Sequence, residues 1–158
     1  TLDTVSIIRF FPLALAALYF GARKWRAAVA LIPLAAMVLF ILHPEGRQAW
    51  YYSLYWLLPL IAALAPRSLA LRSLGSTFTG HAIGSVAFLY TFNLPSAVWI
   101  GLIPIVFLER MLFAGGIMVS YVVFNTILER IATQLHISSL QRLVRPEYIL
   151  SKKLLNSL

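Results

Sequence analysis

The sequence predicts an all-α integral membrane protein: a bundle of five, alternatively six, transmembrane helices with a C-terminal amphipathic helix at the membrane surface. Two features of composition predict this class, since 61% of the 158 residues are hydrophobic and only 11% are charged. A soluble domain is about 45–50% apolar and about 25% charged, so this chain has too little charge to cover a water-facing surface. The third feature is the length of its apolar stretches, because a spanning helix needs about 20 mostly apolar residues.

The same composition excludes other classes. A disordered chain has low hydrophobicity, which this chain does not have. The absence of cysteine excludes a disulfide scaffold and any cysteine-based zinc or redox site.

Five apolar stretches, separated by turn signals, are the predicted helices. Together they form a predicted transmembrane bundle over residues 1–128, and residues 129–158 form a predicted basic amphipathic tail. The stretches are residues 4–22, 25–43, 49–65, 71–92 and 97–128. The turns that end the first four are Gly21 with Arg23 and Lys24, His43 to Gly46, Pro66 to Ser68, and Asn93 to Pro95.

The fifth stretch is too long for one upright crossing. Its 32 residues would form about 48 Å of helix, against a hydrocarbon core of about 30 Å. Either residues 97–103 form an interfacial or re-entrant piece before a span that begins near Pro104, or Glu109-Arg110 marks a hairpin between two short helices. The first alternative gives five crossings and the second gives six.

The basic residues favour five crossings. Of the 13 lysines and arginines, ten lie in the first and third connections and in the tail, which are on one side in that topology. Cytoplasmic segments carry such an excess. We therefore expect a plasma membrane protein with its N-terminus outside and its C-terminus in the cytoplasm. The net charge of +8 then reflects topology and attraction to membrane lipid, and no nucleic-acid partner is expected.

The tail has an amphipathic pattern. Ile131, Leu135 and Leu143 can share one helical side, Pro146 interrupts the helix, and a second apolar stripe ends at Leu158. Such a basic segment is typical of a helix that lies on the inner membrane surface. The same stripe could instead dock a partner membrane subunit on the cytoplasmic side.

The fourth stretch carries small residues every four positions. Ser76, Gly80 and Gly84 form a ridge on which another helix backbone can approach closely. Gly115 and Gly116 in the fifth stretch are also expected to serve close helix packing.

Beside this ridge runs a polar ladder at the same spacing, and His81 is its ionisable member. An ionisable residue inside a span is a candidate functional group, here for ligand binding or proton handling. The alternative is a neutral imidazole that fixes packing by bonding to a neighbouring helix. The ladder consists of Ser73, Thr77, His81 and Ser85.

Glu109 and Arg110 are costly if they lie inside the membrane. Adjacent residues point about 100° apart on a helix, so we expect each to need its own partner. Arg9 in the first stretch enters the membrane at the same depth, and we expect an Arg9–Glu109 ion pair. The functional interpretation is a polar pocket that opens outward and is lined by Arg9, Glu109, Thr77 and, more deeply, His81.

Aromatic residues crowd the start of the third stretch. Tryptophan and tyrosine are common at membrane interfaces. Tyr52 and Trp56, at i and i+4, could instead form a stacking wall for a flat ligand, so Trp56 is a candidate ligand-binding residue.

No catalytic motif or metal site is recognised, and no cofactor is implied. The chain has no phosphate loop, no Ser/His/Asp set and no HExxH motif. No second histidine or carboxylate stands at i+3 or i+4 from His81. An enzyme is therefore poorly supported.

The general build resembles a substrate-binding S component of an energy-coupling-factor transporter. The features that carry the resemblance are the size, the hydrophobic helices, the basic cytoplasmic side, the small residues Ala17 and Gly21, and the outer polar cluster. The resemblance implies a small-molecule ligand bound from outside and a cytoplasmic surface for a coupling subunit. It also implies six helices with both ends inside, whereas the charge pattern favours five.

The sequence is compatible with three functions. The first is a small-solute binding or transport subunit. The second is a structural or assembly subunit of a larger membrane complex, which would use the Ser76–Gly84 ridge and the tail, and the third is a homo-oligomeric channel. The channel requires Ser73, Thr77 and His81 to line a symmetric axis.

Overall fold

The computed structural model of the chain describes residues 4–22, 25–65 and 68–150, with the backbone alone for residues 4, 5, 7–9 and 26. The described residues are helical and contain no strand. The chain divides into two compact units, Thr1–Ala114 (unit 1) and Gly115–Leu158 (unit 2). The helices of unit 1 before the last long helix are α1 (Thr4–Gly21), α2 (Arg26–Val29), α3 (Leu31–Leu42), α4 (Pro44–Gln48), η1 (Trp50–Leu57), α5 (Leu58–Leu64) and α6 (Leu69–Phe92).

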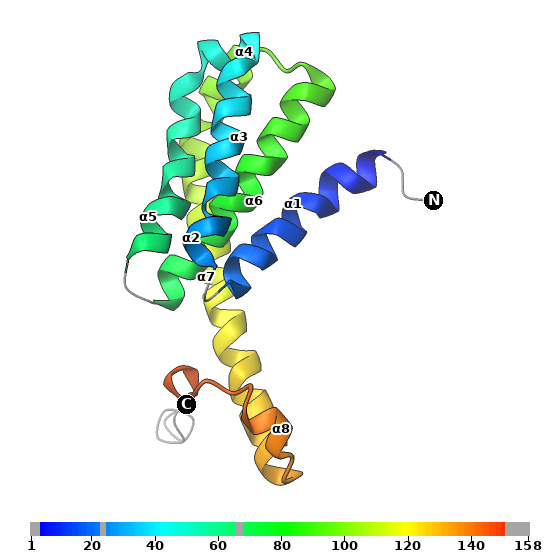
Figure 1. The fold of residues 1–158 in the computed structure, drawn as a ribbon, viewed down its shortest axis with the longest axis vertical. Coiled ribbons are helices and arrows are strands. Elements are labelled where there is room, and N and C mark those ends of the chain that lie inside the picture. Colours follow the sequence, from blue (N-terminus) through cyan, green and yellow to red (C-terminus); the bar gives the residue numbers. More distant parts are fainter. Residues whose placement is uncertain (1–3, 23–24, 66–67, 151–158) are drawn as a thin grey trace. The chain divides into compact units, whose positions relative to one another are not determined.

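Helix α6 is the central element of unit 1, with α1, α3, α5 and η1 packed around it (Figure 1). Ser68 caps its N-terminus, because the Ser68 hydroxyl accepts a hydrogen bond from the Leu71 amide at 3.1 Å. Asn93 ends it in the left-handed conformation, with φ of 48°, which asparagine tolerates. The predicted helix over 71–92 is thus present and begins two residues earlier.

Helix α1 packs on the small residues of α6. The Ser76 hydroxyl donates a hydrogen bond to the Ala16 carbonyl at 2.8 Å. A Cβ placed on Gly80 would lie only 3.1 Å from the Ala16 Cβ, and one on Gly84 would lie 3.9 Å from the ring of Pro12. The ridge Ser76–Gly80–Gly84 therefore faces α1 of the same chain.

Residues Trp50–Leu57 form the 3₁₀ helix η1, which continues into α5. A 3₁₀ helix rises about 2.0 Å per residue against 1.5 Å in an α-helix, so η1 extends further per residue than an α-helix would. Runs longer than three or four residues are uncommon. Residues three apart are eclipsed, and the ring centroids of Tyr52 and Tyr55 lie 6.5 Å apart.

The core of unit 1 is aromatic. The ring of Phe40 stacks on Tyr52 at 5.6 Å and meets the edges of Trp56 and Trp99, each at 5.2 Å. Phe40, Tyr52 and Trp56 are all fully buried. Offset and edge-to-face ring pairs of this kind favour tight packing beyond the burial of apolar area.

Helix α7 (Ser96–Gln134) is continuous over 39 residues. The alternative of a hairpin at Glu109–Arg110 is therefore wrong, and residues 97–103 belong to the same helix as the rest of the stretch. Pro104 lies inside the helix, where it removes one backbone hydrogen bond without ending the helix. The boundary between the two units, after Ala114, lies within this helix and before the division expected at residue 128.

Unit 2 consists of the second part of α7 and a segment that folds back along it. The Asn125 side chain donates to the Arg145 carbonyl at 2.8 Å and accepts from the Arg145 amide at 2.9 Å. The Leu150 amide donates to the Thr126 hydroxyl at 3.1 Å. The helices after α7 are short, namely α8 (Ser138–Gln141) and η2 (Pro146–Tyr148).

The expected amphipathic helix is therefore wrong for the described part of the tail. After Gln134 the described tail contains only the short helices α8 and η2. Pro146 and the pairing of Asn125 with the backbone of Arg145 favour a bent, irregular segment over a helix. The stripe that ends at Leu158 lies outside the described residues.

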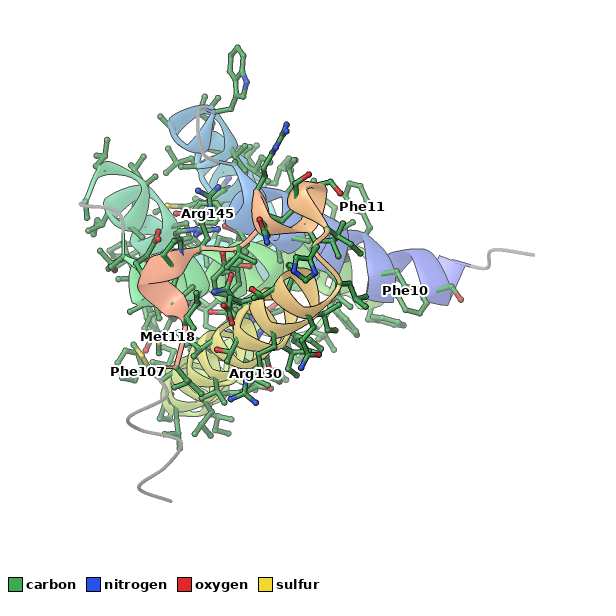
Figure 2. All side chains as sticks on the ribbon, turned by 90° about the horizontal axis from the view of Figure 1, so that it is seen from below. Phe10, Phe11, Phe107, Met118, Arg130 and Arg145 are labelled. Carbon is green, nitrogen blue, oxygen red and sulfur yellow. The ribbon has the colours of Figure 1, made fainter. Side chains whose placement is uncertain are left out.

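Among the described helices, α7 alone is both long and apolar enough to cross a membrane by length and composition. Three further apolar helical segments are shorter: Phe10–Gly21, Ala27–Leu42 and Trp50–Leu64. Large apolar side chains are exposed on α1, α3, α5, α6 and α7, including Phe10, Phe11 and Phe107 (Figure 2).

Candidate functional site

The candidate site is a polar cluster in the middle of unit 1, formed by Tyr52, His81 and Ser85. The Tyr52 hydroxyl lies 2.8 Å from His81 Nε2. The Ser85 hydroxyl lies 3.4 Å from the same nitrogen and 3.5 Å from the Tyr52 hydroxyl. Tyr52 is fully buried and Ser85 is buried, so the His81 ring is held by two groups that water does not reach.

The local fold explains why these three groups meet. His81 and Ser85 are one turn apart on α6 and share a face. Tyr52 comes from η1, and its ring is fixed by Phe40 and Trp99, whose centroids lie 5.6 and 5.3 Å away. Histidine is thus bonded to a neighbouring helix, as one of the two sequence-based interpretations expects, and the bond also puts its imidazole in a fixed orientation.

Arg110 and Glu109 of α7 act on this cluster through their charges. Both interact electrostatically with Tyr52, and Arg110 also interacts with His81. The cluster itself contains two hydroxyls and an imidazole.

Glu109 and Arg110 pair with each other, which corrects the expectation that each needs a separate partner. The distance from Arg110 Nη2 to Glu109 Oε2 is 2.9 Å. Their Cβ atoms diverge on the helix, but the arginine side chain is long enough to reach the carboxylate. Its guanidinium also lies 4.6 Å from the centre of the Phe113 ring, in a cation–π contact.

The two charged groups differ in exposure. The Arg110 side chain is 18% exposed and that of Glu109 is 47% exposed. Arg110 Nε is buried and has no hydrogen-bond partner in the described part of the chain. The cation therefore faces the interior with one unused donor, while the carboxylate lies at the surface of unit 1.

Arg9 lies in α1, but its side chain is outside the described part of the chain. The expected Arg9–Glu109 ion pair remains a prediction. Since the Glu109 carboxylate already binds Arg110, such a pair would be an addition to that ion pair and would not replace a missing partner.

Trp56 and Thr77 are core residues in this structure. Trp56 is fully buried against Phe40 and Tyr52, so the pair Tyr52 and Trp56 does not present an open stacking wall. The indole Nε1 has no partner among the described residues. The Thr77 hydroxyl donates to the Leu74 carbonyl of its own helix at 3.0 Å.

Gly115 and Gly116 are the packing residues for which no partner is seen. A Cβ placed on either would meet nothing within 4 Å of the described residues. The described residues thus give these two glycines no packing partner, and their role in close packing stays a prediction.

An apolar groove of about 420 Å³ lies between η1, α5 and α7. Tyr55 belongs to both the groove and the core, because its ring stacks on Phe107 at 6.2 Å and on Phe78 at 5.9 Å. Its hydroxyl donates to the Ile103 carbonyl at 3.2 Å. The groove is lined by Tyr51, Leu54, Tyr55, Leu58, Ile103 and Phe107.

No group of three or more histidine, aspartate or glutamate side chains that could hold a metal ion occurs within residues 4–22, 25–65 and 68–150. His43 caps α4, with its Nδ1 3.3 Å from the Glu45 amide. His136 has φ of 53° at the end of α7.

Sequence reasoning missed the partnership of Tyr52 with His81. The polar ladder indicated that His81 and Ser85 share a face, but only the packing of η1 on α6 shows which tyrosine meets them.

The chain matches no protein family, no curated protein and no solved structure.

Proposed function

We propose that the chain is an integral membrane protein that binds a small solute, as a binding or transport subunit, at the cluster of Tyr52, His81 and Ser85. The observation that carries the proposal is this cluster itself. It is a set of hydrogen-bonded polar side chains in the interior of a chain that otherwise exposes hydrocarbon. Polar groups inside a membrane are costly, and they are retained where they serve binding or transport.

Membrane insertion is supported by the exposed apolar side chains. Soluble monomers rarely expose contiguous apolar patches larger than a few hundred Å². Here the exposed set includes Phe10 at 64%, Leu64 at 72% and Leu112 at 68%. Lipid would cover these side chains without cost. Five crossings, a plasma membrane location and a cytoplasmic tail remain part of the proposal.

The folded-back tail indicates where along α7 the proposed membrane crossing ends. Irregular backbone exposed to lipid does not occur in the hydrocarbon core. The tail binds α7 at Asn125 and Thr126, and the Tyr148 ring meets Tyr121 at 5.6 Å. The crossing would therefore end near residue 120 and cover about 97–120, roughly 36 Å of helix. Glu109 and Arg110 are then near its middle.

The packing of α6 argues against the two other functions. The ridge Ser76–Gly80–Gly84 is covered by α1, so it offers no free surface to another subunit. Ser73 is fully buried and Thr77 is 6% exposed. Neither side chain is free to line an axis between copies of the chain.

A transport subunit of this kind needs an energy-coupling partner. By the resemblance to S components, that partner would dock on the cytoplasmic side, at the basic connections and the tail. The basic side chains described in unit 2 are Arg130 and Arg145, which are labelled in Figure 2, and Arg142.

The proposal is tested by thermal unfolding of the purified chain in detergent, followed by tryptophan fluorescence. The probes are a panel of water-soluble vitamins, nucleobases and amino acids. A bound solute at a hundred times its Kd stabilises the folded state by about 2.7 kcal/mol, which raises Tm by several degrees. We expect at least one compound to do so, and we expect His81→Asn to abolish the increase.

The matched control is His136→Asn, because His136 is exposed and asparagine accepts its left-handed backbone. This variant should keep the full increase in Tm. If no compound stabilises the chain and it purifies with one stoichiometric membrane partner, the assembly role replaces solute binding.

A further inference from the structure

An apolar stripe runs along the last part of α7, in unit 2. Its residues follow one another at spacings of three, four and four, which places them on one side of the helix. All of them are exposed, from 41% at Ile131 to 70% at Phe124. Over about three helical turns, the described residues therefore leave this side of α7 uncovered. The α7 stripe consists of Phe124, Ile127, Ile131 and Leu135.

The proposed topology places the α7 stripe in water. The folded-back tail binds Asn125 and Thr126, and the Gln141 side chain donates to the Ala132 carbonyl at 3.4 Å. The tail and the stripe therefore lie along the same stretch of α7. Irregular backbone exposed to lipid does not occur in hydrocarbon, so this stretch lies outside the membrane core. An apolar patch exposed to water marks an interaction surface.

The membrane surface does not fit as the cover of the stripe. Within unit 2, residues 115–134 form one uninterrupted helix, and residues 115–120 are the end of the proposed crossing. The helix therefore leaves the bilayer in the direction of the crossing, and residues 121–134 extend it by about 21 Å. A helix that binds a membrane surface lies in the plane of that surface instead.

Basic residues border the α7 stripe on both edges. Arg130 directly precedes Ile131, which places it about 100° around the helix on one edge. Asn125 directly follows Phe124 on the other edge, where its side chain holds the backbone of Arg145 at 2.8 and 2.9 Å. A helix packed on the stripe would thus have an arginine near each of its sides. Charged residues beside an apolar seam set the choice of partner helix.

A second copy of the chain would bring like charges together. In a symmetric dimer the same surface of both copies meets, so the arginine edges would face each other at a cost in free energy. Glu129 lies about 160° around the helix from Ile127 and cannot compensate. In the described tail, Glu147 is one acidic residue against Arg142 and Arg145. The charges therefore favour an acidic partner.

We infer that the α7 stripe docks an amphipathic helix of a partner protein, with an apolar face that covers the stripe and acidic residues on both edges of that face. Amphipathic helices are recognised through apolar anchors three and four residues apart, which is the spacing of the stripe. The inference rests on the proposed function, because it assigns a surface and a chemistry to the cytoplasmic partner that a transport subunit needs.

The test places the photo-crosslinker p-benzoyl-phenylalanine at position 124 of the full chain, in the membrane of the cell that produces it naturally. Phe124 is exposed, so exchanging its ring for another aromatic group should not disturb the fold. Mass spectrometry identifies the crosslinked residues. We expect one partner protein, crosslinked within an amphipathic helix whose apolar face is bordered by Asp or Glu. The same crosslinker at position 143, also exposed, should not capture that helix.

Two matched pairs of variants accompany the crosslinker at position 124. Leu135→Ser should lower the crosslink yield by about tenfold, because it removes an apolar anchor. Leu143→Ser, at a leucine of equal exposure (64% against 63%), should not. Arg130→Glu should lower the yield by about threefold, because it turns an attraction to the acidic edge into a repulsion. Arg142→Glu makes the same change in net charge at another exposed arginine and should leave the yield unchanged.

Several results would overturn the inference. Crosslinks to a second copy of the chain, to residues 151–158 or to lipid would identify a different cover for the stripe, and the absence of any crosslink would show that nothing docks there. Capture of a helix without acidic residues, or a yield that Arg130→Glu leaves unchanged, would show that charge does not select the partner. Stabilisation by a solute is measured on the purified chain and depends on His81, so failure of the proposed function is distinguishable from failure of this inference.

Discussion

The hydroxyl of Tyr52 makes the shortest contact to His81 in the polar cluster, at 2.8 Å, and the ring that carries it is fully buried. Its bond gives the imidazole one orientation within the bundle. The side chain therefore links packing to the site, because the same ring contacts Phe40, Trp56 and Trp99.

Tyr52→Phe should destabilise the chain by about 0.5–2 kcal/mol, because it keeps the ring and removes the partner of a largely buried imidazole. Tyr90→Phe is the control. Tyr90 is 52% exposed and donates to the Leu39 carbonyl at 2.9 Å, so its loss should cost less. Thermal unfolding in detergent measures both, and an equal fall in Tm would contradict a special role for Tyr52.

The positions of the helices were predictable from the sequence, but the 3₁₀ geometry of η1 and the continuity of α7 were not. Apolar stretches bounded by turn residues predicted helical segments close to those observed. This succeeded because the length of an apolar stretch and the turn residues at its ends depend only on neighbouring residues in the sequence. The 3₁₀ geometry of η1 was missed because no local signal distinguishes it. The continuity of α7 was missed because Pro104 and Glu109–Arg110 are local interruptions that the helix accommodates.

The candidate site was also predictable only in part. His81 was predictable as an ionisable residue in an apolar stretch, and Glu109 and Arg110 for the same reason. Their neighbours were not, because the Tyr52–His81 contact joins residues 29 positions apart. Trp56 was misjudged as a ligand wall because an aromatic residue in the third stretch fits either an interface or a core.

The pairing of α1 with α6 gives a prediction for an element. Gly80→Val should destabilise the chain by about 1–3 kcal/mol, because its side chain would enter the 3.1 Å space before the Ala16 Cβ and force the helices apart. Gly101→Val is the control, since a Cβ there meets nothing within 4 Å. Both glycines are inside helices, so the change in helix propensity is the same. Equal melting temperatures would contradict the close approach.

At the scale of the whole molecule, high hydrophobicity and a net charge of +8 have one explanation in the proposed topology. Ten of the 13 basic residues lie in the connections and tail assigned to the cytoplasm, as the positive-inside rule requires. Of the other three basic residues, Arg9 and Arg110 lie within the expected crossings, as Glu109 does, and Arg47 lies in the second connection.

The proposed topology has five membrane crossings, with the C-terminal tail in the cytoplasm. Because the chain has no cysteine, single-cysteine variants labelled with a membrane-impermeant maleimide test it directly in intact cells. The exposed positions are Arg47, Ala70, Thr91 and Ser139. The account predicts that Arg47→Cys and Thr91→Cys react from outside, whereas Ala70→Cys and Ser139→Cys react only after permeabilisation. Reaction of Thr91→Cys and Ser139→Cys from the same side would contradict it.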